Sequence, residues 1–379
     1  MTLFFIKGEC RMLHAKCFDR IWQNNPLRKQ YHDFIARHPK TRQRDIAKSL
    51  SITEAQLIDE QLGLKSLRLT THFADLLKDL VGLGYIMNLT RNDFAVHERM
   101  GAYQNINIHG KMGLVIADDK KIDLRWFLSQ WHSVYAVHEE LSKSDRYSLQ
   151  FFDRSGIAVQ KIFLQKTSNI DHYQYIVQHY LHERQYLPVE YVVEEIAERN
   201  GDVSASIVNT QALRSDWEAM TDVHQFVKLL RNHDVNRQQA FREIGSDYAE
   251  EFSPSDLQRI LLSAAESSLP IMCFVGNVGC IQIFSGAINK VKAMGAWLNI
   301  LDQEFNLHLM ESGIAEAWLV RKPTALGIIT SLEFYSDDGQ QIVQFFGQRH
   351  EQKKENPLWT KLAESVLASD VHYKQVVVA

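Results

Sequence analysis

Apolar and polar residues follow a repeating order along this chain. The stretch SLQFFDRSG (148–156) alternates and then reaches a glycine, as a β-hairpin does, and SLEFYSDDG (331–339) repeats this pattern 183 residues later. The spacing from Asn92 to Gly101 equals that from Asn277 to Gly286, and each segment predicts a turn followed by an alternating strand. The pattern therefore predicts an internal repeat with a period of about half the chain.

Strands and helices are predicted in the same order in both halves. GLVIADDKKIDLRWFL (113–128) and GAWLNILDQEFNLHLM (295–310) each predict strand, loop, strand. Helices are predicted ahead of the strands, over about 16–90 and about 212–268, with one more over 169–184. We therefore expect an α+β fold with a tandem structural duplication. Each half has helices followed by a large antiparallel β-sheet, and the central sheets are flanked by helices.

The repeat sets the expected boundaries of the domains. We expect an N-terminal extension over 1–15, an N-terminal repeat over 16–195, a connector over 196–211 and a C-terminal repeat over 212–379. The stretch NGDVSAS (200–206) within the connector is the most typical of a linker.

The composition is typical of an ordinary globular protein, and it argues against nucleic acid and membranes as partners. Of its 379 residues, 45% are hydrophobic and 23% are charged, and the formal net charge of −4 provides no electrostatic footprint for nucleic acid. Four cysteines in spacings that match no metal motif favour a reducing, cytoplasmic compartment. No stretch approaches the ~18 apolar residues of a membrane span, so we expect no membrane insertion.

One helix in the second half carries a histidine where the pattern asks for an apolar residue. Ser215 and Glu218 form a capping box that predicts a helix start, and His224 then falls on the apolar face between Met220 and Val227. The histidine is either a core residue with both ring nitrogens bonded or a ligand that binds through neutral imidazole. Aligning the helices of the two halves with an offset of 195 places lysine 29 opposite this histidine, so we expect that packing does not require histidine there.

A second candidate site follows the predicted end of this helix. Asn236 is a favourable N-cap for the next helix and places Arg237 and Gln238 in its first turn. Free backbone N–H groups, the positive end of the helix dipole and the guanidinium together suit a carboxylate or phosphate. The alternative for Arg237 is a solvated cap residue.

Seven stretches resemble a known family, the bacterial cytoplasmic haemin-degrading and haem-trafficking proteins of the HemS/HmuS/ChuS group. They are EAMTDVHQF (218–226), NRQQAF (236–241), RNDFAVHE (91–98), IDLRWFLSQW (122–131), GAWLNI (295–300), AEAWLVRKPT (315–324) and FFGQR (345–349). The resemblance covers the chain from about residue 20 to 350. It implies a duplicated fold that holds haem b in a cleft between a sheet and helices, with contributions from both halves.

The resemblance also implies roles for single residues. His224 is similar to the axial ligand of the haem iron, Arg125 to a catalytic residue over the opposite face of the haem, and Phe127 to part of the apolar wall. The other residues that the resemblance places in the pocket or beside the haem propionates are Arg237, Gln238, Lys322, Phe346 and Arg349. Such a set suits haem, an apolar plate with two carboxylates at one edge.

Two positions depart from the family's pattern, and two activities fit it. Phe346 stands where relatives often have tyrosine, and Val227 where they often have a second phenylalanine. The family's proteins either degrade imported haem or carry it to a haem oxygenase. Degradation is an oxygen- or peroxide-dependent ring opening with NAD(P)H or another external reductant, and it releases the iron. Partners implied are an inner-membrane haem importer and a downstream oxygenase or reductase. No GxGxxG motif follows a strand, so a Rossmann-type nucleotide site is not indicated.

A different class of function is suggested by TRQRDIAKSLSITEAQLIDEQL (41–62), which resembles a helix-turn-helix of a DNA-binding regulator. Its second helix would be acidic, with Glu54, Asp59 and Glu60, and the whole chain is negatively charged. Both features weigh against contact with DNA.

Overall fold

The computed structural model describes residues 26–39, 41–141, 144–185, 189–192, 208–349 and 353–377. The expected extension and the linker-like stretch NGDVSAS lie outside these residues. The chain forms two compact units. The first comprises 1–90, 99–194 and 277–280, and the second comprises 91–98, 195–276 and 281–379.

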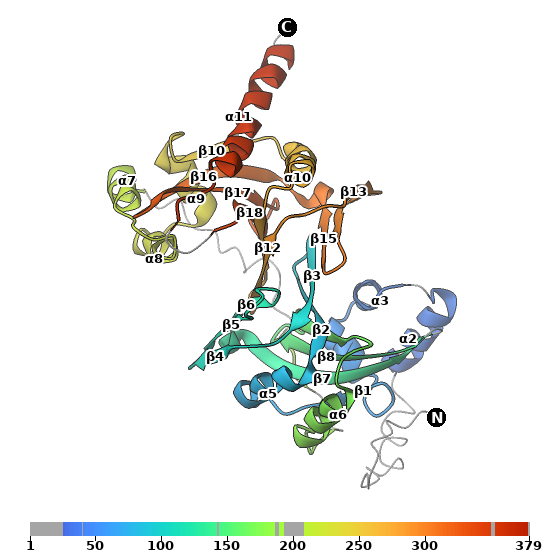
Figure 1. Cartoon of the computed structure of the whole chain (residues 1–379). Coiled ribbons are helices and arrows are strands. Elements are labelled where there is room, and N and C mark those ends of the chain that lie inside the picture. The colour runs from blue at the N-terminus through green and yellow to red at the C-terminus, as the bar shows by residue number, and fades with distance from the viewer. Residues whose placement is uncertain are drawn as a thin grey trace. The chain divides into compact units, whose positions relative to one another are not determined.

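Helices and strands alternate in blocks along the described chain (Figure 1). The α-helices are α2 (Pro26–Arg37), α3 (Gln43–Ser49), α4 (Glu54–Asp59), α5 (Phe73–Asp79), α6 (Ile170–His179), α7 (Thr210–Glu218), α8 (Gln225–Asn232), α9 (Arg237–Ile244), α10 (Asp256–Glu266) and α11 (Pro357–Val377). The 3-10 helices are η1 (Leu80–Leu83), η2 (Leu128–Gln130) and η4 (Glu311–Gly313). The strands of the first half are β1 (Ser66–Arg68), β2 (Tyr85–Arg91), β3 (Ala95–Ala102), β4 (Ile106–His109), β5 (Met112–Ile116), β6 (Asp123–Phe127), β7 (Trp131–Glu140), β8 (Asp145–Asp153) and β9 (Ala158–Leu164). Those of the second half are β10 (Ala249–Phe252), β11 (Ile271–Gly276), β12 (Cys280–Gly286), β13 (Val291–Met294), β14 (Trp297–Leu301), β15 (Phe305–Met310), β16 (Glu316–Thr324), β17 (Gly327–Tyr335) and β18 (Gln341–Gly347).

Within each unit, the described strands pair in antiparallel ladders, as the alternating patterns predict. In the first unit, consecutive neighbours are β1, β7, β8, β9 and β2, and the ladder β4-β5-β6 is separate. In the second unit, the order is β10, β16, β17, β18, β11 and β12, with the separate ladder β13-β14-β15. The hairpin turns at Gly156 and Gly339 have φ of 72° and 78°, a conformation that glycine adopts without strain. The expected α+β duplication is confirmed.

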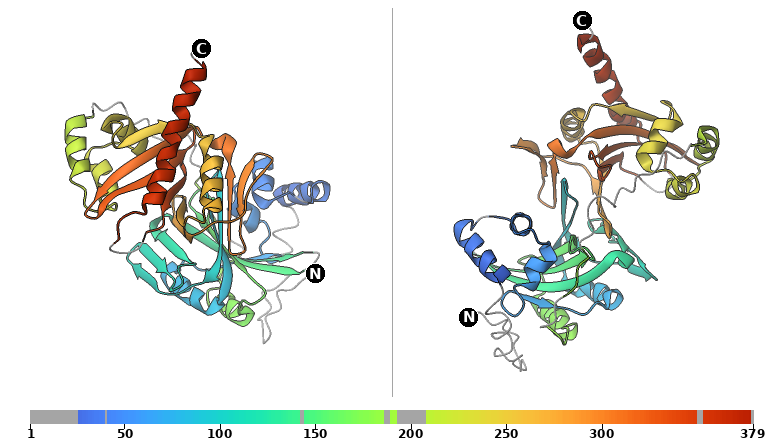
Figure 2. Two further views of the ribbon diagram at one scale, coloured as in Figure 1. Left: turned by 45° about the horizontal axis from the view of Figure 1, so that its top comes forward. Right: turned by 180° about the vertical axis from the view of Figure 1, so that it is seen from behind.

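In the first unit, helices cover both faces of the sheet (Figure 2). Leu77 of α5 and Ile176 of α6 belong to one apolar cluster with Ala136 and Phe151 of the sheet. Residues of α4 pack in another cluster with Tyr135 and its neighbours. Because consecutive side chains of a strand point to opposite faces, one strand serves both clusters.

The second unit is built in the same way. Helices α10 and α11 pack on the face that carries Leu319 and Leu332. Helices α7, α8 and α9 pack on the opposite face, where Trp217, Phe226 and Trp318 form the centre of a cluster. The helices α8 and α9, which carry the candidate residues, are therefore attached to the sheet by aromatic side chains.

The two halves align with an offset of 183 residues in their helices. Helices α4 and α9 begin 183 residues apart, and so do β1 and β10. The capping box of Thr53 and Gln56 is repeated by that of Asn236 and Gln239. The expected offset of 195 for the helices is therefore wrong, because it aligned tryptophans rather than helix caps. With the observed offset, His224 stands opposite Thr41, not lysine 29.

Each compact unit includes a short segment from the other half of the sequence. The Oδ1 atom of Asn92 accepts N–H groups of its own turn, and its Nδ2 donates to the carbonyls of Gly276 at 3.1 Å and Ile342 at 2.8 Å. Asn277 repeats this in the first unit, where its Nδ2 donates to the carbonyl of Val159 at 2.8 Å. The equally spaced asparagines of the sequence therefore hold reciprocally placed turns.

Candidate functional site

His224 lies in a tight loop and not on the apolar face of a long helix. Helix α7 ends at Glu218, α8 begins at Gln225, and His224 is the N-cap residue between them. Its side chain is 87% exposed. The prediction of a single helix starting near Ser215 is wrong, because α7 begins at Thr210 with an asparagine cap and the loop 219–224 interrupts the helical pattern.

Asp222 holds the imidazole of His224. Its Oδ1 accepts the backbone N–H of His224 at 2.8 Å and lies 2.6 Å from Nδ1 of the ring. The pKa of the Asp222 carboxyl lies below its usual value. The main causes are the hydrogen bonds from the backbone N–H and the ring of His224, and the charge of Arg349 adds to them. Because a carboxylate can only accept, Nδ1 is the donor, and in the neutral ring the lone pair is on Nε2.

The cap of α9 is confirmed, and Arg237 in its first turn faces a buried carboxylate. Asn236 and Gln239 form a reciprocal capping box. The guanidinium of Arg237 lies over the ring of Phe226 at 5.1 Å, and its Nη1 is 3.4 Å from Oε2 of Glu333. The side chain of Arg237 is 28% exposed, so part of its donor capacity still faces solvent.

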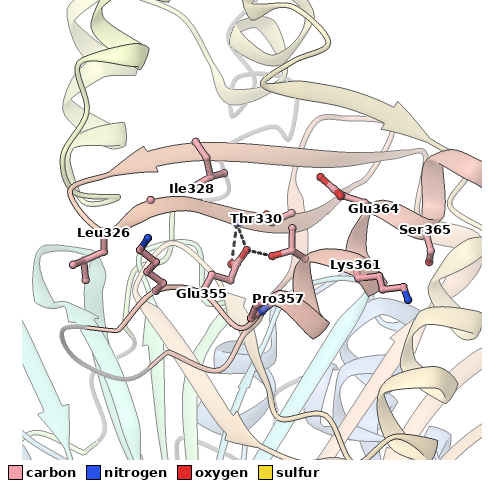
Figure 3. A pocket seen from close by; sticks show the side chains of 11 residues that line it. Leu326, Ile328, Thr330, Glu355, Pro357, Lys361, Glu364 and Ser365 are labelled. Atoms are coloured by element: carbon pink, nitrogen blue, oxygen red, sulfur yellow. Dashed lines mark hydrogen bonds between the residues drawn. The ribbon is translucent and has the colours of Figure 1, made fainter.

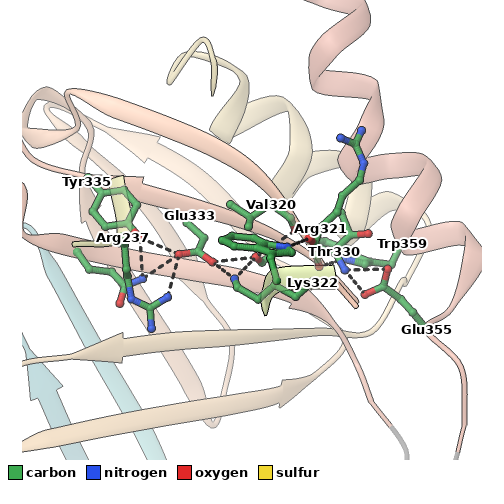
Figure 4. A network of polar contacts seen from close by, with 12 residues as sticks. Arg237, Val320, Arg321, Lys322, Thr330, Glu333, Tyr335, Glu355 and Trp359 are labelled. Carbon is green, nitrogen blue, oxygen red and sulfur yellow. Dashed lines mark hydrogen bonds and ion pairs between the residues drawn. The ribbon is translucent and has the colours of Figure 1, made fainter. Parts of the chain in front are cut away.

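Lys322 is buried in the same network (Figure 4). Its ammonium bonds Oε1 of Glu333 and lies 4.8 Å from the centre of the Phe226 ring. Its side chain is 4% exposed and that of Glu333 is 0% exposed. Tyr335 donates to the other carboxylate oxygen at 2.7 Å. Burial lowers the pKa of Lys322 despite the attraction of Glu333. Lys322 is therefore an internal partner of Glu333, rather than a cation at the rim of a pocket.

The remaining candidates of the second unit differ in exposure. Arg349 is exposed after β18, and its charge contributes to the lowered pKa of Asp222. Phe346 is half-buried and packs edge-on against Phe274, with ring centres 5.0 Å apart. Gln238 is buried beside the turn at Gly339. Arg349 is thus exposed like Asp222 and His224, whereas Gln238 is buried.

Arg125 and Phe127 belong to the first unit, on strand β6. The guanidinium of Arg125 pairs with the carboxylate of Asp123, two residues earlier on the same face of the strand. Burial raises the pKa of Asp123, although Arg125 opposes this. Both candidates are half-buried, and the exposed side chains of Met112 and Leu114 on β5 pair with them in register. This face of the ladder therefore carries three apolar side chains beside the Arg125–Asp123 ion pair, and Asn107 and His109 of β4 pair in register with Leu114 and Met112.

Sequence reasoning missed two acidic residues of the site. Asp222 stands two residues before His224, the spacing at which a carboxylate caps a loop and reaches a ring nitrogen. That spacing could have been read from TDVHQF. Glu333 has no comparable signal, because only the fold brings it from β17 to Lys322 on β16 and Arg237 on α9.

A pocket of about 630 Å³ lies elsewhere in the second unit, between β17 and the start of α11 (Figure 3). Leu326 and Ile328 form its apolar side. Glu355 accepts the N–H of Thr330 and the hydroxyl of Thr360, both at 2.9 Å, and its pKa is raised by burial. None of the residues predicted for the site lines this pocket.

Other candidates from the sequence have structural roles. The second helix of the helix-turn-helix-like segment is α4, whose Glu54 and Asp59 are buried against Lys161 and Tyr135. This helix therefore has no free face for a DNA groove. Cys273 and Cys280 are buried free thiols, so they form no disulfide. In the described part of the chain, no helix combines the length and apolar character needed to cross a membrane.

Comparison with known proteins gives one consistent result. The family described as the haemin-degrading HemS.ChuX domain matches the chain twice, over 51–180 and 234–366. The hemin transport protein HmuS of Yersinia pestis is 37% identical over 92% of this chain and 99% of its own, and HemS of Yersinia enterocolitica is 38% identical over 87% and 94%. Among solved structures, holo-PhuS, a heme-binding protein from Pseudomonas aeruginosa, is 40% identical and matches 90% of this chain and 98% of its own with a TM-score of 0.85. ChuS, an E. coli heme oxygenase, is 36% identical and matches 90% and 99% with a TM-score of 0.81.

Proposed function

The chain belongs to the haemin-degrading HemS.ChuX domain family, and on this premise we propose that it binds haem with His224 as the axial ligand of the iron. The exposed imidazole carries the proposal. Its Nδ1 is held by Asp222, so the neutral ring offers the lone pair of Nε2 to a metal. Neutral imidazole is a common ligand of haem iron.

Groups around His224 suit the rest of the haem molecule. The guanidinium groups of Arg237 and Arg349 are partly or fully exposed and can pair with the propionates, for which arginine has a matching geometry. The side chain of Val227, one turn of helix beyond the histidine, is 54% exposed and offers an apolar contact. We leave Lys322 out of the propionate partners, because its side chain is only 4% exposed and cannot reach a ligand at the surface.

We propose that Arg125 and Phe127 of the first unit also contact haem. The support comes from strand β6, where Asp123 pairs with Arg125. A guanidinium donates hydrogen bonds but has no lone pair, so Arg125 stabilises negative charge without binding iron itself. Phe127 and the neighbouring Met112 supply apolar contact for a porphyrin ring.

We further propose that the chain acts in the cytoplasm and opens the ring of imported haem, releasing iron for the cell. Haem, as substrate, supplies the iron-centred redox chemistry, dioxygen or peroxide supplies the oxygen that opens the ring, and an external reductant such as NAD(P)H or ascorbate supplies the electrons. The residues of the chain bind the iron, orient the haem through its propionates and stabilise negative charge that develops beside it. The alternative is carriage of haem from an importer to a downstream oxygenase or reductase. The transport names of the two Yersinia relatives favour it.

An absorbance titration with haemin tests the ligand. The Soret band is expected to shift on binding, and His224→Ala is expected to abolish the shift. His72→Ala is the matched control, because His72 is also an exposed histidine at the N-cap of a helix. If His224→Ala gives an unchanged spectrum, the assignment of the ligand is wrong.

A second experiment separates the enzyme from the carrier. The ferric complex is given ascorbate or NADH in air, with catalase present because free peroxide destroys haem without an enzyme. Loss of the Soret band with iron release and a bilin-like product supports ring opening. A persistent band with transfer of haem to apomyoglobin supports the carrier.

A further inference from the structure

We propose that Asp222 is a positioning residue for His224, which it holds in the one tautomer and orientation that present Nε2 to an incoming metal centre. This inference rests on the proposed role of His224 as a ligand. The tautomer of His224 can be measured without haem, and the effect of Asp222 on affinity can be measured with haem.

The contacts of Asp222 set the state of the ring. One oxygen, Oδ1, receives the backbone N–H of His224 at 2.8 Å and lies 2.6 Å from Nδ1. A carboxylate has no proton to donate, so in neutral imidazole Nδ1 must be the donor. The lone pair is then on Nε2. With the side chain 87% exposed, that lone pair faces outwards.

The carboxylate is itself held by its loop. The side-chain oxygen of Gln225 accepts the N–H of Thr221 at 2.9 Å and the N–H of Asp222 at 3.3 Å. Its Nε2 donates to the hydroxyl of Thr221 at 3.2 Å. The carbonyl of Thr221 accepts the N–H of Ala325 in the β16–β17 turn at 2.9 Å, which ties the loop to the sheet. The imidazole is therefore aimed by a chain of bonds that ends in the core sheet.

The second unit contains a second Asp–His pair with the opposite arrangement. Nε2 of His233 lies 2.8 Å from Oδ2 of Asp216, and the His233 side chain is 13% exposed. In this pair the carboxylate of Asp216 occupies Nε2, the nitrogen through which His224 is proposed to bind iron. The ring of His233 is also largely covered. This pair is a matched control, because it has the same residue types and a similar distance but presents no free Nε2.

A carboxylate behind a ligating histidine fixes the ring and increases its basicity. Removal of such a partner typically weakens metal binding by about 10- to 100-fold. Asp222→Ala removes both the bond and the charge. Asp222→Asn keeps an oxygen that accepts from Nδ1 but removes the charge, so the two variants separate orientation from electrostatics.

Nitrogen NMR of ¹⁵N-histidine-labelled protein without haem tests the first half of the proposal. Wild-type protein is expected to show His224 protonated at Nδ1. Asp222→Asn is expected to keep this form, and Asp222→Ala to shift it towards the Nε2-protonated form that free imidazole side chains prefer. An unchanged tautomer in Asp222→Ala overturns the proposal.

Haem titration and the reduction potential of bound haem test the second half. We expect about 10- to 100-fold weaker binding for Asp222→Ala, a smaller loss with a more positive potential for Asp222→Asn, and no change for Asp216→Asn. Haem affinity within twofold of wild type in both Asp222 variants overturns the positioning role. If His224→Ala instead binds haem normally, the proposed ligand is wrong, whereas the tautomer measurement still decides how Asp222 holds the ring.

Discussion

Replacing Glu333 with glutamine is expected to destabilise the second unit by about 3 kcal/mol at neutral pH. The carboxylate is fully buried between Lys322, Arg237 and Tyr335. Glutamine has a similar shape, but it leaves the ammonium of Lys322 buried without a counter-charge. Removing one partner of a buried ion pair typically costs ~3–5 kcal/mol.

The pKa of Glu333 supports the same magnitude. Burial opposes its ionisation, but the attraction of Lys322 and Arg237 and the hydrogen bonds of Lys322 and Tyr335 lower the pKa from 4.5 to about 2. A change of one in a pKa corresponds to about 1.4 kcal/mol, so the lowered pKa of Glu333 is equivalent to about 3 kcal/mol of stability. The lowered pKa of Lys322 offsets part of this gain, which places the expected cost at the lower end of the range.

The dependence on pH has a defined sign. A carboxyl whose pKa is lowered on folding stabilises the fold above its unfolded pKa, and this contribution is lost as the pH falls to its folded pKa. The difference in unfolding free energy between wild type and Glu333→Gln should therefore shrink between pH 4.5 and about pH 2.

Thermal unfolding, followed by the fluorescence of Trp217 and Trp318 in the cluster around α8, measures the effect. A loss of about 3 kcal/mol lowers the midpoint of a unit of this size by about 6–12 °C. Asp247→Asn is the control, because it removes the charge from an exposed pair with Arg214 and should leave the midpoint within about 2 °C of wild type. If Glu333→Gln unfolds within about 2 °C of wild type at pH 7, the reasoning from a buried charge is refuted.

Three further predictions follow from other parts of the structure. Asn277→Ala is expected to lower the stability by about 2 kcal/mol in denaturant titration, because it leaves the carbonyl of Val159 and the N–H groups of its own turn without this partner; a cost below about 0.5 kcal/mol would contradict the role of the turn. Haem titration is expected to end at one haem per chain, since Thr41 stands at the position of His224 in the first half; a second equivalent that survives His224→Ala would contradict this. In a variant without the two N-terminal cysteines, a thiol reagent is expected to react only after unfolding, because burial raises the pKa of Cys280 to about 12 and that of Cys273 far above its usual range; rapid labelling of the folded protein would contradict this burial.

Local patterns were sufficient for much of the fold. The hairpins that turn at Gly156 and Gly339, the turns at Asn92 and Asn277 and the N-cap at Asn236 were all predicted from the sequence and are present. Each depends on bonds within a few residues or on a period of two or 3.6, so the sequence specifies them directly. The α+β duplication follows from the repetition of these patterns.

The helix around His224 was predicted wrongly for a physical reason. Apolar periodicity alone cannot distinguish one long helix from two short helices that bury the same residues. Side-chain bonds of Asp222 and Gln225 to the backbone compete with helix formation and open the loop between α7 and α8. The histidine thereby leaves the apolar face and becomes exposed.

What the sequence determined by itself is therefore the order of elements, their repetition and the residue types available for chemistry. What only the tertiary structure decided is which charges meet. The sequence identifies Lys322 and Arg237 only as two basic residues. Folding places both against Glu333, and only Arg237 keeps part of its side chain exposed. The reason is that the free energy of a charge depends on its burial and on its partners, and both are set by segments far apart in the sequence.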